Sequence, residues 1–408
     1  MKRFCAFQRV IHSSSYSVTT KRNSRVAISA SFEEKDAKEI LPLSQMPGPK
    51  SYPFIGSGLA LLMHKDFDRR KFYKVFDSFF REYGKIFQMR NRGRPNTILI
   101  SKPEDVEELH RITMGNPIRH FFVSLKSVRE DNVDYFENKT GLITENHQEW
   151  QRVRSKVQGQ MLRPKNLLKY LPQMDRINLD FIEIIADYQN QLGEMPPHFL
   201  NDLYKWSLES VSTVALNRRL GCLEPNLPED SMQMQMIKCA NNAVEAMNIT
   251  EIRFPFWKLF ATPSYKKLRK NHDIFLRIAD EIIRETEKNL LTKKASEDDA
   301  EMTLMETFLK TEGLTRKDVV TMVLDMMFAG IDTTSHTVAF TLYMLAKNQD
   351  KQKKLQEEID NVLGDGKETI SEKHLSKLSY LKHCVKETLR IYPITFGVSR
   401  DLEDKTQF

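Results

Sequence analysis

The sequence predicts a mainly α-helical protein with a small β region, and three observations support this prediction. The 408-residue chain is 40% hydrophobic and 29% charged, which is enough apolar material for a large core. From about residue 147 onward, strand-like alternation nearly disappears and long segments with helical periodicity follow one another. Two β-rich runs in KIFQMRNRGRPNTILI flank a Gly93-Arg94-Pro95 turn and predict one hairpin.

The first residues predict a targeting segment. Residues 1–30 contain six basic residues, many serines and no acidic residue, and Glu33 is the first carboxylate. This composition is typical of a mitochondrial transit peptide, which we place at 1–32 with a linker at 33–44, although an ordinary disordered basic terminus has the same composition. No window reaches the roughly 18 to 20 apolar residues of a membrane span, so no transmembrane anchor is expected.

A single folded domain is predicted over residues 45–408. It begins at MPGPKSYPFIGSG, in which three prolines and three glycines exclude a helix, and continues with a helical pattern at 67–83 before the hairpin. No Gly/Ser-rich or Pro-rich linker divides the chain after this point. The later helices are predicted at 147–158, 165–190, 201–217, 230–248, 264–290, 315–347, 350–363 and 376–391.

No metal site built from side chains alone is predicted. Cys222, Cys239 and Cys384 are scattered without C-x-x-C spacing, and the histidines show no H-x-x-x-H pattern. The net charge of +7 is modest for this length, and no nucleic-acid partner is expected.

The segment MMFAGIDTTSHTVAF, residues 326–340, lies in the middle of the helix predicted at 315–347, which Thr315 and Asp318 would cap. A buried carboxylate such as Asp332 must find a partner, take up a proton or border a wet cavity. Threonine hydroxyls can bond to the carbonyl one turn back, and Gly330 lets another group approach the backbone. The segment therefore fits either a polar notch that brings protons to a reaction centre or a helix kink whose Asp332 pairs with an arginine.

A second candidate element is SYLKHCVKETLRIYP. Glu387 and Arg390 are three residues apart and can pair, and apolar neighbours suggest that the pair is half-buried. Lys382 and Lys386 share a different stripe of the same helix. They fit a docking patch for an acidic partner, or simply two solvated lysines.

Two further segments have two interpretations each. In ENHQEWQRVRSK, Trp150 and Arg154 lie one helical turn apart, which suits an anionic group but also describes an aromatic packed beside a solvated arginine. The segment IRFPFWKLFATPSYKK, residues 252–267, combines clustered aromatics with basic ends. It either rests on a membrane surface or fills the core beneath a loop.

In the order and separation of these elements, the chain resembles the cytochrome P-450 family of heme-thiolate monooxygenases. AGIDTT resembles the family's oxygen-activating helix motif, ETLR its Glu-x-x-Arg, WQRVR its Trp-x-x-x-Arg, and PGPKSYPFIG its proline-rich hinge. Each motif alone would be weak, but four in register over residues 45–408 are specific. The resemblance implies the cytochrome P-450 fold.

The resemblance implies a role for each candidate residue. Thr333 would provide a hydrogen bond and a proton route to oxygen, and Asp332 would relay protons to it. Glu387 and Arg390 would be structural and would stabilise the core beneath the heme. The residues implied in binding heme (iron protoporphyrin IX), chiefly through its propionates, are Trp150, Arg154, Ala329, Gly330 and Arg400.

The N-terminal composition and YLKHCVKETLR are further similar to the mitochondrial branch of animal enzymes. In that branch, lysines at the positions of Lys382 and Lys386 receive an acidic adrenodoxin-like ferredoxin, which an NADPH-dependent ferredoxin reductase reduces. The likeness is nearest to invertebrate members that hydroxylate ecdysteroids or handle xenobiotics. It implies a peripheral protein on the matrix side of the mitochondrial inner membrane. The implied activity is hydroxylation of a lipophilic substrate with O2. RFPFWKLFATPSYKKL is similar to the loop with which members of this branch touch the membrane.

One departure concerns the iron ligand. In the family this is a cysteine in a Phe-x-x-Gly-x-Arg-x-Cys-x-Gly loop, whose thiolate favours O–O cleavage. The sequence stops at Phe408 before that loop, and Cys384 lies on the helix of Glu387 and Arg390. We therefore expect a C-terminally truncated fold without the ligand loop and the last helix, which does not form the thiolate-ligated heme as written. The alternative is a heme-free helical binding protein, an inactive fragment that retains ferredoxin docking.

Overall fold

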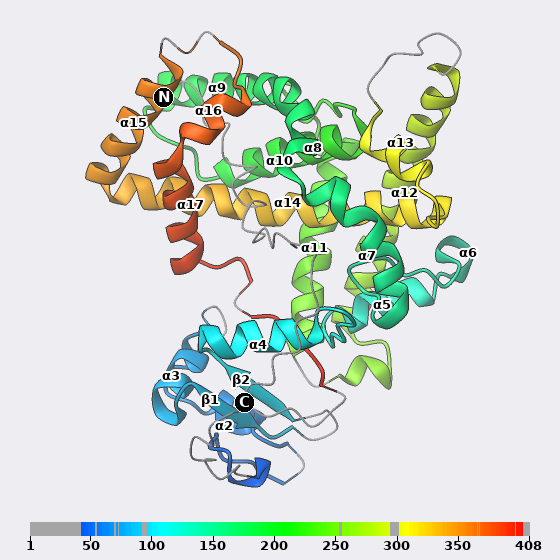
Figure 1. Ribbon diagram of the computed structural model, residues 1–408, viewed down its shortest axis with the longest axis vertical. Coiled ribbons are helices and arrows are strands. Elements are labelled where there is room, and N and C mark those ends of the chain that lie inside the picture. Colours follow the sequence, from blue (N-terminus) through cyan, green and yellow to red (C-terminus); the bar gives the residue numbers. More distant parts are fainter. Residues whose placement is uncertain are drawn as a thin grey trace, which may run out of the picture. The chain divides into compact units, whose positions relative to one another are not determined.

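The structure is a computed structural model (Figure 1) that describes residues 42–402 apart from 54, 69–70, 72, 92–95, 253–254, 294–301, 365, 367 and 396, and only the backbone of 290–293. Its contacts form two compact units: one comprises His120–Thr395, and the other the described parts of Val18–Arg119 and Phe396–Phe408. The predicted transit peptide, most of the linker and the Gly93-Arg94-Pro95 turn lie outside the described residues. A single domain over 45–408 stays a prediction.

The smaller unit contains the predicted hairpin, which the structure confirms. Strand β1 (Ile86–Met89) pairs antiparallel with β2 (Thr97–Ile100), with Phe87 opposite Leu99. A small core of Val75, Phe79 and Phe87 lies between the hairpin and the neighbouring helix α3. The other elements are η1 (Leu43–Gln45), α2 (Gly58–Leu62), α3 (Tyr73–Tyr83) and α4 (Pro103–Thr113).

The proline-rich segment before α2 packs directly on β1. The backbone N–H of Gln88 donates to the Pro47 carbonyl at 2.8 Å. A Cβ atom at Gly48 would lie 2.0 Å from the Gln88 carbonyl oxygen, so a side chain cannot be accommodated there without moving the strand. The glycine between two prolines thus allows a stiff segment to approach the hairpin closely.

Every regular element in the described residues of the larger unit is a helix, which confirms the mainly α prediction. The predicted helix at 165–190 is divided in the structure, and α9 begins at Leu171 with a proline in its first turn, where proline is tolerated. Its elements are α5 (Val123–Glu130), α6 (Val133–Phe136), α7 (His147–Leu162), α8 (Pro164–Leu167), η2 (Leu168–Tyr170), α9 (Leu171–Leu192), α10 (Phe199–Leu216), α11 (Met232–Ile252), η3 (Phe256–Lys258), α12 (Pro263–Lys293), α13 (Leu304–Leu309), α14 (Arg316–Lys347), α15 (Gln349–Leu363), α16 (Glu372–Lys377) and α17 (Ser379–Ile391).

Helix α14 crosses the larger unit (Figure 1) and organises its core. It is one continuous helix of 32 residues, about 48 Å long at ~1.5 Å per residue. The predicted cap is present: the Thr315 side chain accepts from the Asp318 N–H, and the Asp318 carboxylate accepts from the Thr315 N–H at 2.7 Å. Within the described part of the chain, no helix is long and apolar enough to cross a bilayer.

Helix α10 packs closely along α14, and small residues make this possible. A Cβ atom at Gly330 would lie 2.8 Å from a Val211 methyl group. The Ser207 hydroxyl donates to the Gly330 carbonyl at 3.1 Å, and the Ser335 hydroxyl donates to the Leu203 carbonyl at 3.0 Å. The group that approaches the backbone at Gly330 is therefore a valine of the neighbouring helix, held in place by two interhelical hydrogen bonds.

Candidate active site along the central helix

A cavity of about 670 Å³ lies against one face of α14 in the larger unit. Its volume is within the usual range of small-molecule sites, and most of its wall is apolar, with Met161, Met174 and Leu389 contributed by other helices. Helix α14 contributes Met322, Asp325 and Met326 to this wall, followed by a run of short side chains. The short residues of α14 in this wall are Ala329, Gly330, Thr333, Thr334 and Thr337.

The threonine hydroxyls on this face are oriented by their own helix. The Thr333 hydroxyl donates to the Ala329 carbonyl at 2.8 Å, and the Thr337 hydroxyl donates to the Thr333 carbonyl at 2.8 Å. A hydroxyl carries one proton and two lone pairs, so Thr333 presents acceptors to the cavity in this rotamer. A change of its side-chain rotamer would redirect the proton into the cavity.

Asp332 lies at the edge of this face and does not line the cavity. Its carboxylate oxygen Oδ1 is 3.2 Å from Nδ1 of His336, one turn further along α14. This hydrogen bond raises the pKa of His336, and burial opposes the effect. On α10, burial and then the charge of Asp332 raise the pKa of Tyr204 to about 12. The partner of Asp332 is thus a histidine in a continuous helix, whereas the kink interpretation expected an arginine.

Asp325 is an acidic residue of the cavity wall that the sequence reasoning missed. It is only 4% exposed, and its Oδ1 accepts from Nη2 of the fully buried Arg129 at 2.6 Å. Its Oδ2 has no hydrogen-bond partner among the described residues. Arg129 also donates to the Thr140 carbonyl at 2.6 Å and to Nε2 of His272 at 3.3 Å. A signal was present, because Asp325 stands seven residues before Asp332 and hence on a similar side of the helix.

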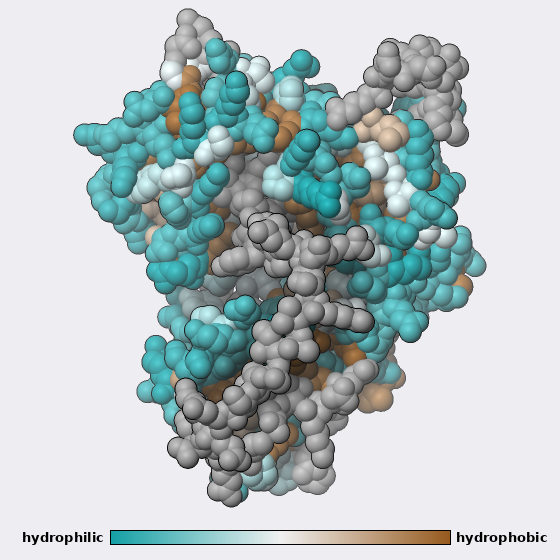
Figure 2. All heavy atoms as spheres, in the orientation of Figure 1, coloured by the Kyte–Doolittle hydropathy of each residue, from teal (hydrophilic) through white to brown (hydrophobic). Residues whose placement is uncertain are grey.

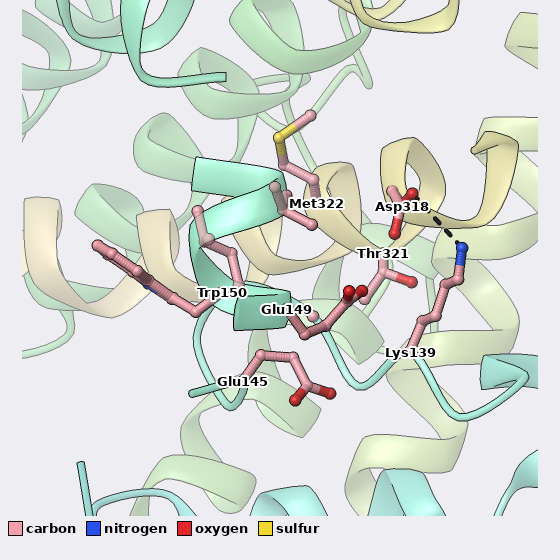
Figure 3. A pocket seen from close by; sticks show the side chains of 10 residues that line it. Lys139, Glu145, Glu149, Trp150, Asp318, Thr321 and Met322 are labelled. Carbon is pink, nitrogen blue, oxygen red and sulfur yellow. Dashed lines mark ion pairs between the residues drawn. The ribbon is translucent and has the colours of Figure 1, made fainter. Parts of the chain in front are cut away.

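Trp150 and Arg154 lie together on α7, with the guanidinium 5.9 Å from the indole ring centre. Trp150 contributes to a smaller pocket with Glu149 and Thr321 (Figure 3), which shares the wall residues Leu142 and Met322 with the large cavity. Neither Trp150 nor Arg154 lines the large cavity itself.

The surroundings of Arg154 fit an anionic ligand. The side chain is half-buried, burial lowers the pKa of its guanidinium, and no carboxylate of the described residues pairs with it. A partly desolvated cation without a counter-charge is stabilised by a carboxylate ligand. The cavity volume and this arginine are compatible with a heme and its propionates.

Arg400 belongs to the smaller unit. Its Nη1 donates to the Ser399 carbonyl at 2.8 Å, its Nη2 is 3.5 Å from Nδ1 of His110, and burial lowers its pKa. These contacts all lie within the smaller unit. That Arg400 binds the heme propionates together with Trp150 and Arg154 therefore stays a prediction.

On α17, Glu387 and Arg390 form a two-pronged ion pair with both N–O distances at 2.7 Å. Their side chains are 56% and 71% exposed, so the expectation of a half-buried pair was wrong. Such an exposed pair contributes little to stability. On the same helix, Lys382 is partly exposed and Lys386 is exposed. Neither lysine has an acidic partner among the described residues. The surface over α15 and α17 is mainly hydrophilic (Figure 2).

The aromatic segment between α11 and α12 is partly packed on the protein and partly exposed, so its contact with a membrane stays a prediction. Trp257 packs on the protein, donating to the Thr250 carbonyl at 3.2 Å and stacking on Tyr265. Phe256, Leu259 and Phe260 are exposed, and Phe254 lies outside the described residues.

Comparisons with known proteins agree on one family. The sequence model of the family described as Cytochrome P450 matches residues 46–408. The chain is 31% identical over 398 residues to "Probable cytochrome P450 49a1" of Drosophila melanogaster, covering 95% of this chain and 66% of that protein. It is 31% identical to "Probable cytochrome P450 301a1, mitochondrial" of Drosophila melanogaster (89% and 66%) and 31% identical to "Cytochrome P450 CYP12A2" of Musca domestica (93% and 70%). The chain thus spans just under two thirds of the length of the first two relatives.

Proposed function

Because the chain belongs to the cytochrome P450 family, we propose that it serves as a heme-dependent monooxygenase that hydroxylates a lipophilic substrate with electrons from a mitochondrial ferredoxin. The observation that carries this proposal is the cavity of about 670 Å³ against α14, with the Thr333 hydroxyl in its wall. Its predominantly apolar wall favours a steroid-like, ecdysteroid-like or xenobiotic substrate over a charged one.

Heme, the cofactor of this family, supplies the activation of dioxygen when bound. Ala329, Gly330 and Thr333 line the cavity that would hold it, and Trp150 and Arg154 would hold its propionates from α7. The apolar wall offers water few hydrogen-bond partners near the reacting C–H bond. In such a site protons must arrive through side chains, and we assign this task to Thr333 and Asp332.

We place the protein in the mitochondrion because two of its relatives carry the word "mitochondrial" in their names. This location supports a ferredoxin as the electron donor. Lys382 and Lys386 on α17 would receive it. The exposed side chains of Phe256, Leu259 and Phe260 support peripheral contact with the inner membrane on its matrix side. Subcellular fractionation that found the protein outside mitochondria would contradict this placement.

The direct test uses a version of the protein that carries the cysteine loop of the family, because we expect no thiolate-ligated heme without it. It compares Thr333→Ala with Thr341→Ala in a system reconstituted with heme, ferredoxin, its NADPH-dependent reductase, and a panel of ecdysteroids and apolar xenobiotics. Thr341 makes the same kind of hydrogen bond to the carbonyl four residues back, at 2.8 Å, but does not line the cavity. The measured quantity is product formed per NADPH consumed. We expect Thr333→Ala to lower it several-fold and Thr341→Ala to leave it near the wild-type value. Equal coupling in Thr333→Ala and the wild type would refute the assigned role.

A further inference from the structure

The pair of His336 and Asp332 is a polar contact beside the cavity that the functions assigned above leave unexplained. Nδ1 of His336 is 3.2 Å from the Asp332 carboxylate and 2.9 Å from the Asp332 backbone carbonyl. A carbonyl oxygen only accepts hydrogen bonds, so in the resting pair Nδ1 carries a hydrogen whether the ring is neutral or charged. The nitrogen that gains and loses a proton with pH is therefore Nε2, on the opposite side of the imidazole.

The surroundings of His336 place it between protein and solvent. Its side chain is 31% exposed and that of Asp332 is 25% exposed, whereas Thr333 opens into the cavity. Tyr204 of α10 contacts the ring edge-on at 5.8 Å, and Phe340 of α14 lies 6.2 Å away. Among the described residues, Asp332 and Tyr204 are thus the titratable groups in contact with the ring. Tyr392, stacked at 4.9 Å on Phe340, is linked to the ring through Phe340.

We propose that His336 is a positioning residue that delivers protons from solvent to Asp332, as the outer member of a route that runs from His336 through Asp332 to Thr333 at the cavity. This proposal rests on the proposed monooxygenase function. In each step Nε2 takes a proton from water, and Nδ1 releases its own proton to Oδ1 of Asp332. The ring is left neutral, with its hydrogen on Nε2. Rotation of the side chain then lets Nδ1 take a proton from water while Nε2 releases its own to water, which restores the starting tautomer.

The ionisation of the pair supports this arrangement. The hydrogen bond to Asp332 raises the pKa of His336 despite partial burial. The charged pair is therefore fully formed below the unfolded value of about 6.5 and is lost as the pH rises through the higher folded value. A donor with these properties keeps its proton to a higher pH than a free imidazole and exchanges protons with water, which a wholly buried carboxylate cannot do.

The first experiment measures the pair itself and needs no turnover. Exchange of the imidazole C2 hydrogen with deuterium, followed by mass spectrometry of each histidine-containing peptide across pH, gives a titration curve for His336. We expect its midpoint to lie above 6.5 in the wild type and to fall in Asp332→Asn. The curve of His198, whose ring contacts Tyr188, serves as the internal control within each protein. An unchanged His336 curve in Asp332→Asn would refute the proposal.

The second experiment measures proton delivery in the reconstituted protein. His336→Gln keeps a hydrogen-bond donor for Asp332 but cannot pass a proton through its side chain. We expect product per NADPH to fall roughly tenfold in this variant, which is part of the ~10²-fold that a positioned proton donor contributes. In the wild type, we expect product per NADPH to decline as the pH rises through the His336 midpoint, and we expect this decline to be absent in His336→Gln. Wild-type coupling with the wild-type pH profile in His336→Gln would overturn the proposal. Failure of the monooxygenase function shows separately, as absence of product in the wild type.

Discussion

The buried ion pair between Arg129 and Asp325 gives the sharpest prediction about stability. The two side chains are 0% and 5% exposed, and their N–O distance is 2.6 Å. Replacement by Asp325→Ala leaves a fully buried guanidinium without its counter-charge. Breaking a buried pair in this way costs about 3 to 5 kcal/mol. Because Arg129 keeps its bond to the Thr140 carbonyl, we expect about 3 kcal/mol, near the lower limit of that range.

The assay is urea-induced unfolding followed by circular dichroism, with Glu387→Ala as the control because it breaks an ion pair that is largely exposed. The double variant Arg129→Met with Asp325→Leu removes both charges while it keeps most of the volume. We expect it to recover most of the stability that Asp325→Ala loses, because the penalty comes from an unpaired charge. The reasoning is wrong if Asp325→Ala shifts the unfolding midpoint no more than Glu387→Ala does, or if the double variant is less stable than Asp325→Ala.

Two predictions concern surfaces. Replacing Lys382 and Lys386 together by glutamate should weaken ferredoxin binding at low salt by about tenfold, and this loss of affinity should shrink as ionic strength rises. The control Lys165→Glu on α8 should change the affinity little. Calorimetric titration measures these affinities, and equal weakening by Lys165→Glu would count against a docking patch on α17. Flotation with vesicles that contain anionic lipid should recover less protein after three exposed side chains are changed to serine, and unchanged recovery would rule out this loop as the membrane contact. These side chains are Phe256, Leu259 and Phe260.

Local features of the fold could be predicted because their causes are local. The cap formed by Thr315 and Asp318 needs two residues three apart, and helical periodicity located α14 to within one residue at its start. A similar cap starts α13, where Thr303 and Glu306 carry the same pattern, but the helix has only six residues and too little periodicity to be recognised. The partner of Asp325 lies 196 residues away, and no local pattern indicates such a contact.

The wrong expectation for Glu387 and Arg390 has a geometric cause. Val385 is buried, and its position in the sequence beside the pair suggested that the pair was buried too. Residues two apart on a helix point about 200° apart, so a buried Val385 places Glu387 on the opposite, solvent side. Proximity in sequence is therefore a poor guide to burial, and the inner stripe of α17 is formed instead by Leu381, Val385 and Thr388.

The same geometry divides the polar residues in the middle of α14 among separate tasks. Gly330 is placed against Val211 of α10, and Ser335 bonds to α10, so both hold the two helices together. Thr333 faces the cavity, and Asp332 turns toward His336. An inactive Gly330 variant is accordingly weak evidence about oxygen chemistry, because any side chain there must push against Val211 and disturb the contact with α10. Thr333 is the more informative position, since removing its hydroxyl changes the cavity wall and leaves the contact between the two helices in place.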